Sequence, residues 1–185
     1  MQIFASDLLD SLSQSPAAAE QRVGVDIGVT KLPYFIDKAV AISESGSYPP
    51  STQQVHLTGF DTLIRILDPK YYPPEKKLGA LDAFLAQHRL RVAYRTGDQW
   101  GGKSAQDEYL EELEKGGREK DGGKREWVTE GRIVMCDGRQ DGEETVSSTR
   151  VREAVKRGDR ELLGKLVTSR VAEWILERGL YLENE

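Results

Sequence analysis

The stretch "VHLTGFDTLIRILDP", residues 55–69, decides the fold of this chain, because a strand and a helix meet in it at one glycine. Val55 to Thr58 form a short apolar run that predicts a strand. Gly59 follows as a turn residue, and the spacing of the apolar residues after it predicts a helix. Pro69 ends that helix, since the residue before a proline disfavours helical backbone.

Further strands and helices are predicted on both sides of this stretch. Apolar runs predict strands over 22–29 ("RVGVDIGV"), 90–97 ("LRVAYRTG") and 132–138 ("RIVMCDG"). The spacing of apolar residues predicts helices over 3–12, 34–43, 75–88, 148–159 and 168–181. Strands that alternate with helices indicate a parallel sheet covered on both faces, so we expect an α/β, Rossmann-like fold. In such folds ligands bind at the carboxyl ends of the strands.

Length and composition exclude several classes of protein. A chain of 185 residues is expected to form one domain over 1–185 around a single core. A net charge of −5 gives no basis for nucleic-acid binding, which needs a basic face. No run approaches the ~18 apolar residues that span a bilayer, so we expect no membrane association. The single cysteine, Cys136, excludes an internal disulfide and predicts a reducing compartment, the cytoplasm or the nucleus.

The stretch "VSSTRVR" (146–152) begins a predicted helix with the hydroxyl residues Ser147, Ser148 and Thr149. Serine and threonine are strong helix N-caps, so one interpretation is a capped helix with arginines on its surface. The other interpretation is a phosphate site, because the free N–H groups of a helix N-terminus attract anions. Arg152, one turn into the helix, could hold a phosphate through two parallel hydrogen bonds. Both interpretations can hold together.

Two predicted strand ends carry further candidate residues. Gly59 allows a ligand or another backbone to approach closely. Asp61 either caps the following helix or accepts hydrogen bonds from a ribose or a substrate amide. Arg95 is either a surface side chain or a ligand-binding group just past its strand. Because the carboxyl ends of parallel strands meet at one edge of a sheet, these residues together favour a site there.

These stretches resemble, in order, the motifs of one enzyme family. "VSSTRVR" is similar to the ISSTxxR motif of the nicotinamide and nicotinate mononucleotide adenylyltransferases, in the HIGH-type nucleotidylyltransferase superfamily. "TGFD" (58–61) resembles the family's GxD element, and "AYRTG" (93–97) resembles its strand ending in R-x-G. "PYFIDKA" (33–39) resembles the stretch that opens the helix beside the nicotinamide site. "LVTSRVAEWILERGLY" (166–181) resembles the family's ending, with a threonine in place of the usual proline.

The resemblance implies transfer of AMP from ATP to nicotinamide mononucleotide (NMN), which yields NAD and pyrophosphate. "DPKYYPP" (68–74) resembles the fungal-type branch of the family. Such transfers depend on positioning and on neutralising phosphate charge rather than on a covalent nucleophile. Mg²⁺ would come with ATP, held mostly by phosphate oxygens and water.

The resemblance also implies a role for each candidate residue. The candidate residues at the start of the helix predicted over 148–159 would bind the ATP phosphates: Ser147, Ser148, Thr149 and Arg152. Gly59 and Asp61 would contact the ribose or the nicotinamide side of the nucleotide, and Arg95 would lie near the base or the phosphates. Tyr34 would lie beside the nicotinamide site.

The catalytic signature of the family, GxFxPxHxGH after an N-terminal strand, is absent from this sequence. The two histidines, His56 and His88, each lack a second histidine two or three residues away, so no catalytic residue is identified. The resemblance implies that the first two strands of the family and the helix between them are missing ahead of Met1. Their absence predicts a gap of about 14 Å between the strands at 22–29 and 54–59, or closure of those strands onto each other.

Three hypotheses follow for function. The first is an NMN adenylyltransferase relative that lacks the catalytic half of its site. The second is a non-catalytic nucleotide-binding or interaction module that keeps only the phosphate-binding turn. The third keeps the enzyme class with another acceptor, as in pantetheine-phosphate or cytidylyl transfer, although the tail and the stretch 34–37 favour a pyridine acceptor.

The segment 98–130 is rich in glycine and charge and predicts a mobile, solvated insertion with one short acidic helix. Trp100 and Trp127 flank it. Ordinary packing is expected for both side chains, and stacking on a nicotinamide ring is the alternative. Trp174, on the last predicted helix, is expected in the core.

Overall fold

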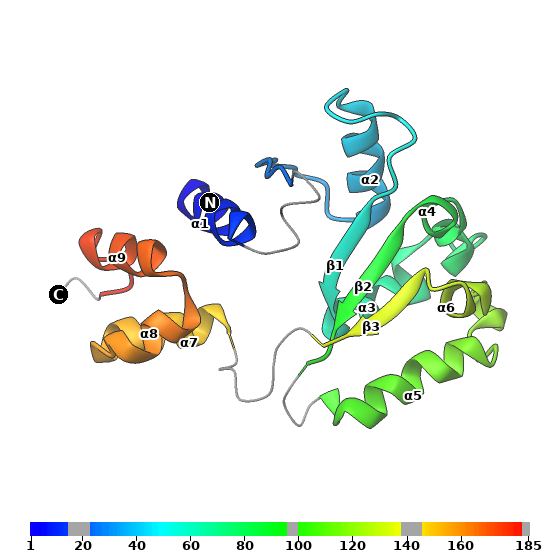
Figure 1. Ribbon diagram of the computed structural model, residues 1–185. Coiled ribbons are helices and arrows are strands. Elements are labelled where there is room, and N and C mark those ends of the chain that lie inside the picture. Colours follow the sequence, from blue (N-terminus) through cyan, green and yellow to red (C-terminus); the bar gives the residue numbers. More distant parts are fainter. Residues whose placement is uncertain (15–22, 96–99, 138–145, 183–185) are drawn as a thin grey trace. The chain divides into compact units, whose positions relative to one another are not determined.

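The computed structural model describes residues 1–14, 23–95, 100–137 and 146–182 (Figure 1). The chain divides into two compact units, which we name the sheet unit (Thr30–Asp141) and the helical unit (Met1–Val29 with Gly142–Glu185). The α/β, parallel-sheet class expected from the sequence is confirmed, whereas the single domain over 1–185 stays a prediction. Every described helix is too short or too polar to span a bilayer.

The sheet unit contains three parallel strands in the order β1-β2-β3 (Figure 1). They are β1 (Val55–Gly59), β2 (Arg89–Ala93) and β3 (Ile133–Cys136). Gly59 lies opposite Ala93, which lies opposite Cys136, so the three carboxyl ends meet at one edge of the sheet. We call this the carboxyl edge.

Helices alternate with the strands of the sheet unit along the chain, as the sequence pattern predicts. The α-helices are α2 (Phe35–Glu44), α3 (Phe60–Ile66), α4 (Asp82–Gln87), α5 (Lys103–Glu114) and α6 (Glu126–Thr129). The short 3₁₀ helices are η2 (Pro69–Tyr71), η3 (Lys77–Leu81) and η5 (Glu119–Asp121). The helix predicted over 75–88 therefore forms in two parts, a 3₁₀ turn through Gly79 and then α4. Glycine weakens α-helical propensity, which fits the break.

The core of the sheet unit lies on one face of the sheet. Leu90, Val92 and Ile133 point to this face and are at most 1% exposed. Leu63 of α3 packs into the same core and is also fully buried. On the opposite face of β1, an edge strand among the described residues, Leu57 is 79% exposed. Most of the buried area of this sheet is therefore made on a single face.

The segment 98–130 differs from the expected solvated insertion. Its described part contains α5 and α6, and three of its apolar side chains belong to the buried core of the sheet unit: Leu110, Leu113 and Trp127. Trp100 packs against that core with a half-buried side chain, so the packing expected for both tryptophans is confirmed. Glycines and charges dominate the composition of this segment, but its few apolar residues recur at helical spacing and bury one face of α5.

The strand predicted over 22–29 does not form. Residues 23–29 have no regular secondary structure, and Arg22 lies outside the described residues. Val29 is 95% exposed and Ile27 is 46% exposed. A strand exists only where its backbone pairs with a neighbour, and alternating valines alone do not supply that partner. The described sheet ends at β1, so the gap expected between the strands at 22–29 and 54–59 is not observed among the described residues.

The helical unit contains α1 (Gln2–Ser13), α7 (Ser148–Arg157), α8 (Arg160–Leu166) and α9 (Ser169–Glu177). The buried residues of its core are Val151, Ala154, Val155, Leu163, Leu166 and Ile175. Thr168, at the position where the family has proline, donates a hydrogen bond to Asp7 of α1. Trp174 is 41% exposed, so its predicted place in the core is wrong. The other apolar residues of α9 supply the buried face instead.

Candidate functional site

Gly59, Asp61 and Arg95 come together at the carboxyl edge, as the strand ends predicted. Gly59 ends β1 and caps α3, and Asp61 lies in the first turn of that helix. Arg95 follows β2, and its Nε donates a hydrogen bond to Oδ1 of Asp61 at 2.5 Å. The pair joins two neighbouring strand ends and is partly exposed, with 47% of the arginine side chain and 20% of the aspartate side chain accessible. Both charged groups are therefore within reach of a ligand at this edge.

The guanidinium of Arg95 lies directly over Gly59. A β-carbon placed on Gly59 would come within 2.5–2.7 Å of three atoms of the Arg95 side chain, which is closer than van der Waals contact. Gly59 has φ −98°, a value open to any residue, so the glycine is needed for space rather than for backbone conformation. The group that approaches Gly59 is the Arg95 side chain, and the predicted approach of a ligand or another backbone stays a prediction.

Replacing Gly59 with alanine should displace the Arg95 side chain and change the stability of the fold little. The guanidinium is the free end of a flexible side chain, and losing an exposed ion pair costs about 0–1 kcal/mol. Urea denaturation should therefore give nearly the wild-type free energy of unfolding, while nucleotide affinity falls. Gly79→Ala is the matched control, because a β-carbon there meets open space. Equal affinities for the two variants would remove Arg95 from the site.

Four residues at the carboxyl edge were missed by sequence reasoning. Tyr94 donates a hydrogen bond to Asp107 of α5, and Lys103 Nζ lies 4.6 Å from the centre of the Tyr94 ring. Lys103 also forms an ion pair with Asp137, which follows β3, at 2.8 Å. Desolvation and the hydrogen bond to Asp107 raise the pKa of Tyr94 to about 12, so the phenol stays neutral at physiological pH. Tyr94 and Asp137 each follow a strand directly, a signal that could have found them.

Gln106 is a fifth missed residue, and its side chain is fully buried. Its Oε1 accepts a hydrogen bond from the backbone N–H of Arg95 at 3.0 Å, and its Nε2 donates to the carbonyl oxygen of Arg95 at 2.7 Å. No sequence pattern distinguishes this glutamine from a surface residue in a charged segment. Only the packing of α5 against the sheet brings it to Arg95.

Tyr34 lies in a second part of the sheet unit, at the N-cap of α2. It lines a cavity of about 340 Å³ together with Arg65, Tyr71 and Tyr72. The volume lies within the range of small-molecule pockets, and the lining combines aromatic rings with one guanidinium. Burial raises the pKa of Tyr72 to about 12, and its hydroxyl donates to the carbonyl oxygen of Ile66 at 2.7 Å. This pocket can take a planar ring.

The start of α7 carries the other predicted residues. Ser147 is the N-cap, and its Oγ accepts a hydrogen bond from the backbone N–H of Arg150 at 3.2 Å, so the capping interpretation is confirmed. Ser148, Thr149 and Arg152 are exposed, and Arg152 Nη2 donates to Oγ of Ser148 at 3.2 Å. The phosphate-binding interpretation stays a prediction. These residues belong to the helical unit, whereas Gly59, Asp61, Arg95 and Tyr34 belong to the sheet unit, and Gly97 lies outside the described residues.

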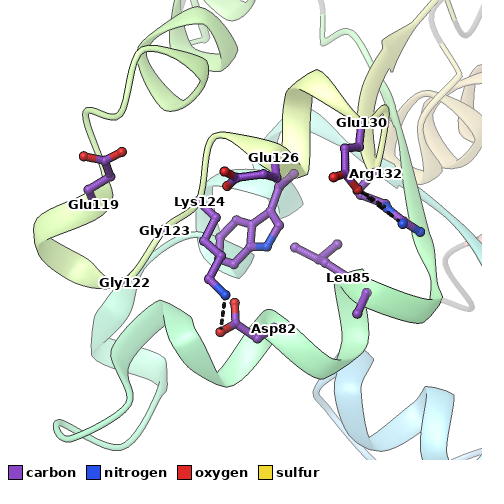
Figure 2. A pocket seen from close by; sticks show the side chains of 11 residues that line it. Asp82, Leu85, Glu119, Gly122, Gly123, Lys124, Glu126, Glu130 and Arg132 are labelled. Carbon is purple, nitrogen blue, oxygen red and sulfur yellow. Dashed lines mark hydrogen bonds and ion pairs between the residues drawn. The ribbon is translucent and has the colours of Figure 1, made fainter.

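A larger cavity, of about 670 Å³, lies at the other end of the sheet, where α4 and α6 lead into β2 and β3 (Figure 2). Figure 2 shows the Lys124 side chain reaching Asp82, with which it forms an ion pair of 2.8 Å. Trp127 lines the same cavity. Four carboxylates and two cationic side chains line this cavity: Asp82, Glu119, Glu126, Glu130, Lys124 and Arg132. An excess of negative charge opposes binding of a triphosphate. The carboxyl edge is therefore the better candidate site.

His56 and His88 lie away from the carboxyl edge. The His56 ring lies 5.5 Å from that of Phe35 and 5.2 Å from that of Phe84, between centroids. His56 Nε2 is buried without a hydrogen-bond partner among the described residues. His88 follows α4, and its Nδ1 accepts a hydrogen bond from the backbone N–H of Gln54 at 3.2 Å. Both imidazoles are thus part of the core of the sheet unit.

Because of these two histidines, we expect the protein to lose stability in weak acid. Burial lowers the pKa of both imidazoles from 6.5, and the neighbouring His88 and Lys38 lower that of His56 further. The unfolded chain therefore binds protons at a higher pH than the folded chain, so the free energy of unfolding falls as the pH drops below about 6.5. Urea denaturation between pH 7.5 and pH 5 measures this loss.

His56→Phe is the matched variant, since phenylalanine fits the aromatic surroundings and does not titrate. Its free energy of unfolding should depend less on pH than that of the wild type. An unchanged pH dependence would show that the buried imidazole does not cause the loss.

The described part of the chain contains no group of three or more His, Cys, Asp or Glu side chains that could hold a metal ion.

Comparison with known proteins gives one informative similarity. No protein-family model matches this chain, and no solved structure matches it. A curated protein of Schizosaccharomyces pombe (strain 972 / ATCC 24843), named "Putative nicotinamide mononucleotide adenylyltransferase", is 31% identical over 149 residues. The matched residues are 80% of this chain and 56% of the relative, so the chain spans a little over half the length of the curated relative that it matches. The ordered motifs and this similarity agree on the family that the chain resembles.

Proposed function

We propose that this chain is an NMN adenylyltransferase-like domain that binds ATP and NMN. In the reaction of that class, a phosphate oxygen of NMN attacks the α-phosphorus of ATP. The bond from that phosphorus to the oxygen bridging to the β-phosphate breaks, so NAD forms and pyrophosphate leaves. Such a transfer needs two nucleotides held in line and a site that offsets phosphate charge.

The observation that carries the proposal is the ion pair of Asp61 and Arg95 over Gly59. It joins two motifs that the sequence matched to the family separately, and it lies at the carboxyl edge, where open α/β sheets bind nucleotides. Arg95 supplies a guanidinium for a phosphate or a base. Asp61 supplies an acceptor for ribose hydroxyls or the nicotinamide amide.

The remaining proposed contacts divide between ATP and NMN. Ser148, Thr149 and Arg152 at the start of α7 would bind the ATP phosphates, while Ser147 orders the first turn by capping it. The free N–H groups of that turn favour the same anion. On the acceptor side, the aromatic pocket at Tyr34 would lie beside the nicotinamide ring.

Mg²⁺ would enter with ATP. Mg²⁺ bound to nucleotides is held largely by phosphate oxygens and water, so the ion would need few ligands from the protein. Arg152 would contribute positive charge in the helical unit, and Arg95 would do so separately at the carboxyl edge of the sheet unit. A net charge of −5 argues against a nucleic-acid partner, whose binding needs a basic face.

A second candidate function is nucleotide binding without catalysis. The sequence has no HxGH pair, and neither of its histidines lies at the carboxyl edge. His56 is inside β1 among aromatic rings, and His88 precedes β2. The chain would then lack the histidines of the family signature GxFxPxHxGH for the transfer step. Arg95 and the start of α7 would still bind phosphate.

Two measurements on the purified chain test both functions. Calorimetric titration with MgATP and with NMN should give saturable binding of each. Incubation of the two nucleotides, followed by an alcohol dehydrogenase assay for NAD, tests turnover. Binding with turnover supports the enzyme, and binding without turnover supports the non-catalytic module. If the chain does not bind ATP, both proposed functions are contradicted. If it forms product from ATP and phosphopantetheine but not from ATP and NMN, its acceptor is phosphopantetheine rather than NMN.

A further inference from the structure

Gln106 is a long polar side chain that is buried in a segment whose described charged residues are exposed or half-buried. It lies in the first turn of α5 and is 0% exposed. A buried amide destabilises a fold unless its donors and acceptor are hydrogen-bonded. Here the amide is satisfied, with Oε1 bound to the N–H of Arg95 and Nε2 bound to the carbonyl oxygen of Arg95. A weaker contact of 3.4 Å joins Nε2 to the carbonyl oxygen of Gly101.

The two hydrogen bonds fix the backbone of one residue on both sides of its Cα. Arg95 lies two residues beyond the end of β2, where the ladder of the sheet no longer holds the chain. The side-chain amide of Gln106 takes the place of a neighbouring strand, because it offers an acceptor and a donor as a peptide group does. The direction of the Arg95 side chain toward Gly59 and Asp61 consequently depends on Gln106.

We propose that Gln106 is a positioning residue, which holds Arg95 over Gly59 and so sets the affinity of the carboxyl edge for ATP. The inference rests on the proposed function for the role of Arg95, whereas the geometry of Gln106 and Arg95 does not depend on it. No other residue type fits the position equally well. Asparagine is one methylene too short, glutamate lacks the N–H donor, and methionine has the length but neither polar group.

The test uses Gln106→Met in the full chain, with Gln87→Met as the control, since Gln87 is exposed at the end of α4. The first readout needs no ligand. The Nε–H group of Arg95, bound to Asp61, should give a proton–nitrogen NMR signal in the wild type that is protected from exchange with water. Arg95→Lys assigns that signal. In Gln106→Met the protection should be lost, and in Gln87→Met it should remain.

The second readout is ATP affinity measured in two backgrounds. Gln106→Met should weaken ATP binding about tenfold in the wild type. It should have no further effect in Arg95→Ala, which has already lost the guanidinium. The loss of stability should be equal in both backgrounds, because Arg95→Ala keeps the backbone groups that Gln106 binds. If the role of Gln106 is purely structural, Gln106→Met should lower stability, and its effect on ATP affinity should not depend on the Arg95 side chain.

The results test the positioning role of Gln106 and the proposed function separately. An unchanged Nε–H signal in Gln106→Met, or an affinity loss that persists in Arg95→Ala, overturns the positioning role. A wild-type chain that binds no ATP contradicts the proposed function, and the ligand-free NMR comparison still decides the role of Gln106. If Gln106→Met does not fold, Gln106→Asn gives the same readouts, because its amide is too short to reach both groups of Arg95.

Discussion

Arg152→Ala should weaken ATP binding by roughly 1.5–3 kcal/mol, or about 10- to 150-fold, the scale of one charged hydrogen-bonded contact. Arg152 lies one turn into α7 and is exposed, and its Nη2 already donates to Ser148 at the start of the helix. The guanidinium is therefore held beside the free N–H groups that favour an anion. Calorimetric titration of the variant with MgATP measures the loss.

Arg157→Ala is the control for this prediction. Arg157 is an exposed arginine in the last turn of the same helix, at the end where the helix dipole repels anions. The control should bind ATP as the wild type does and should match Arg152→Ala in net charge and stability. If both variants bind equally well, the start of α7 is an ordinary capped helix and the phosphate interpretation fails.

Leu63→Ala should lower the free energy of unfolding by about 2–5 kcal/mol, the cost of emptying a well-packed leucine site. Leu63 is 0% exposed in the middle of α3, within the core cluster of the sheet unit. A domain of this size is stable by only about 5–15 kcal/mol, so the variant should lose a large part of its stability. Urea denaturation followed by circular dichroism gives the difference.

The same substitution at Leu57 is the control, because that side chain is 79% exposed on the edge strand β1. An exposed position should change the free energy of unfolding by no more than about 0.5 kcal/mol. A comparable loss in both variants would mean that a further layer covers this face of β1 in solution. The comparison therefore also measures how completely the sheet is buried.

Local patterns in the sequence predicted most of the secondary structure. The helices α1, α2, α3, α7 and α9 follow from apolar residues at helical spacing, and Pro69 correctly places the end of α3. β1, β2 and β3 follow from short apolar runs. These signals depend only on neighbours within a few residues along the chain, so they can be read without a tertiary structure.

The errors have a common cause in contacts between distant segments. Residues 23–29 alternate like a strand but are not part of the described sheet, and Trp174 lies on the exposed side of its helix. In the segment 98–130, the charged composition predicted a solvated insertion, while Leu113 and Gln106 are buried. Composition describes the average of a segment, whereas burial is decided by the few residues that face another element.

The sequence by itself determined the α/β class, the end of β1 at Gly59, the place of Arg95 just past β2 and the capped start of α7, since each depends on residue types and spacing along one short stretch. Only the tertiary structure decided that Arg95 lies over Gly59 and pairs with Asp61, and that Gln106 holds its backbone. These contacts join residues 11 to 36 positions apart, and their formation depends on the register of the parallel strands and the packing of α5.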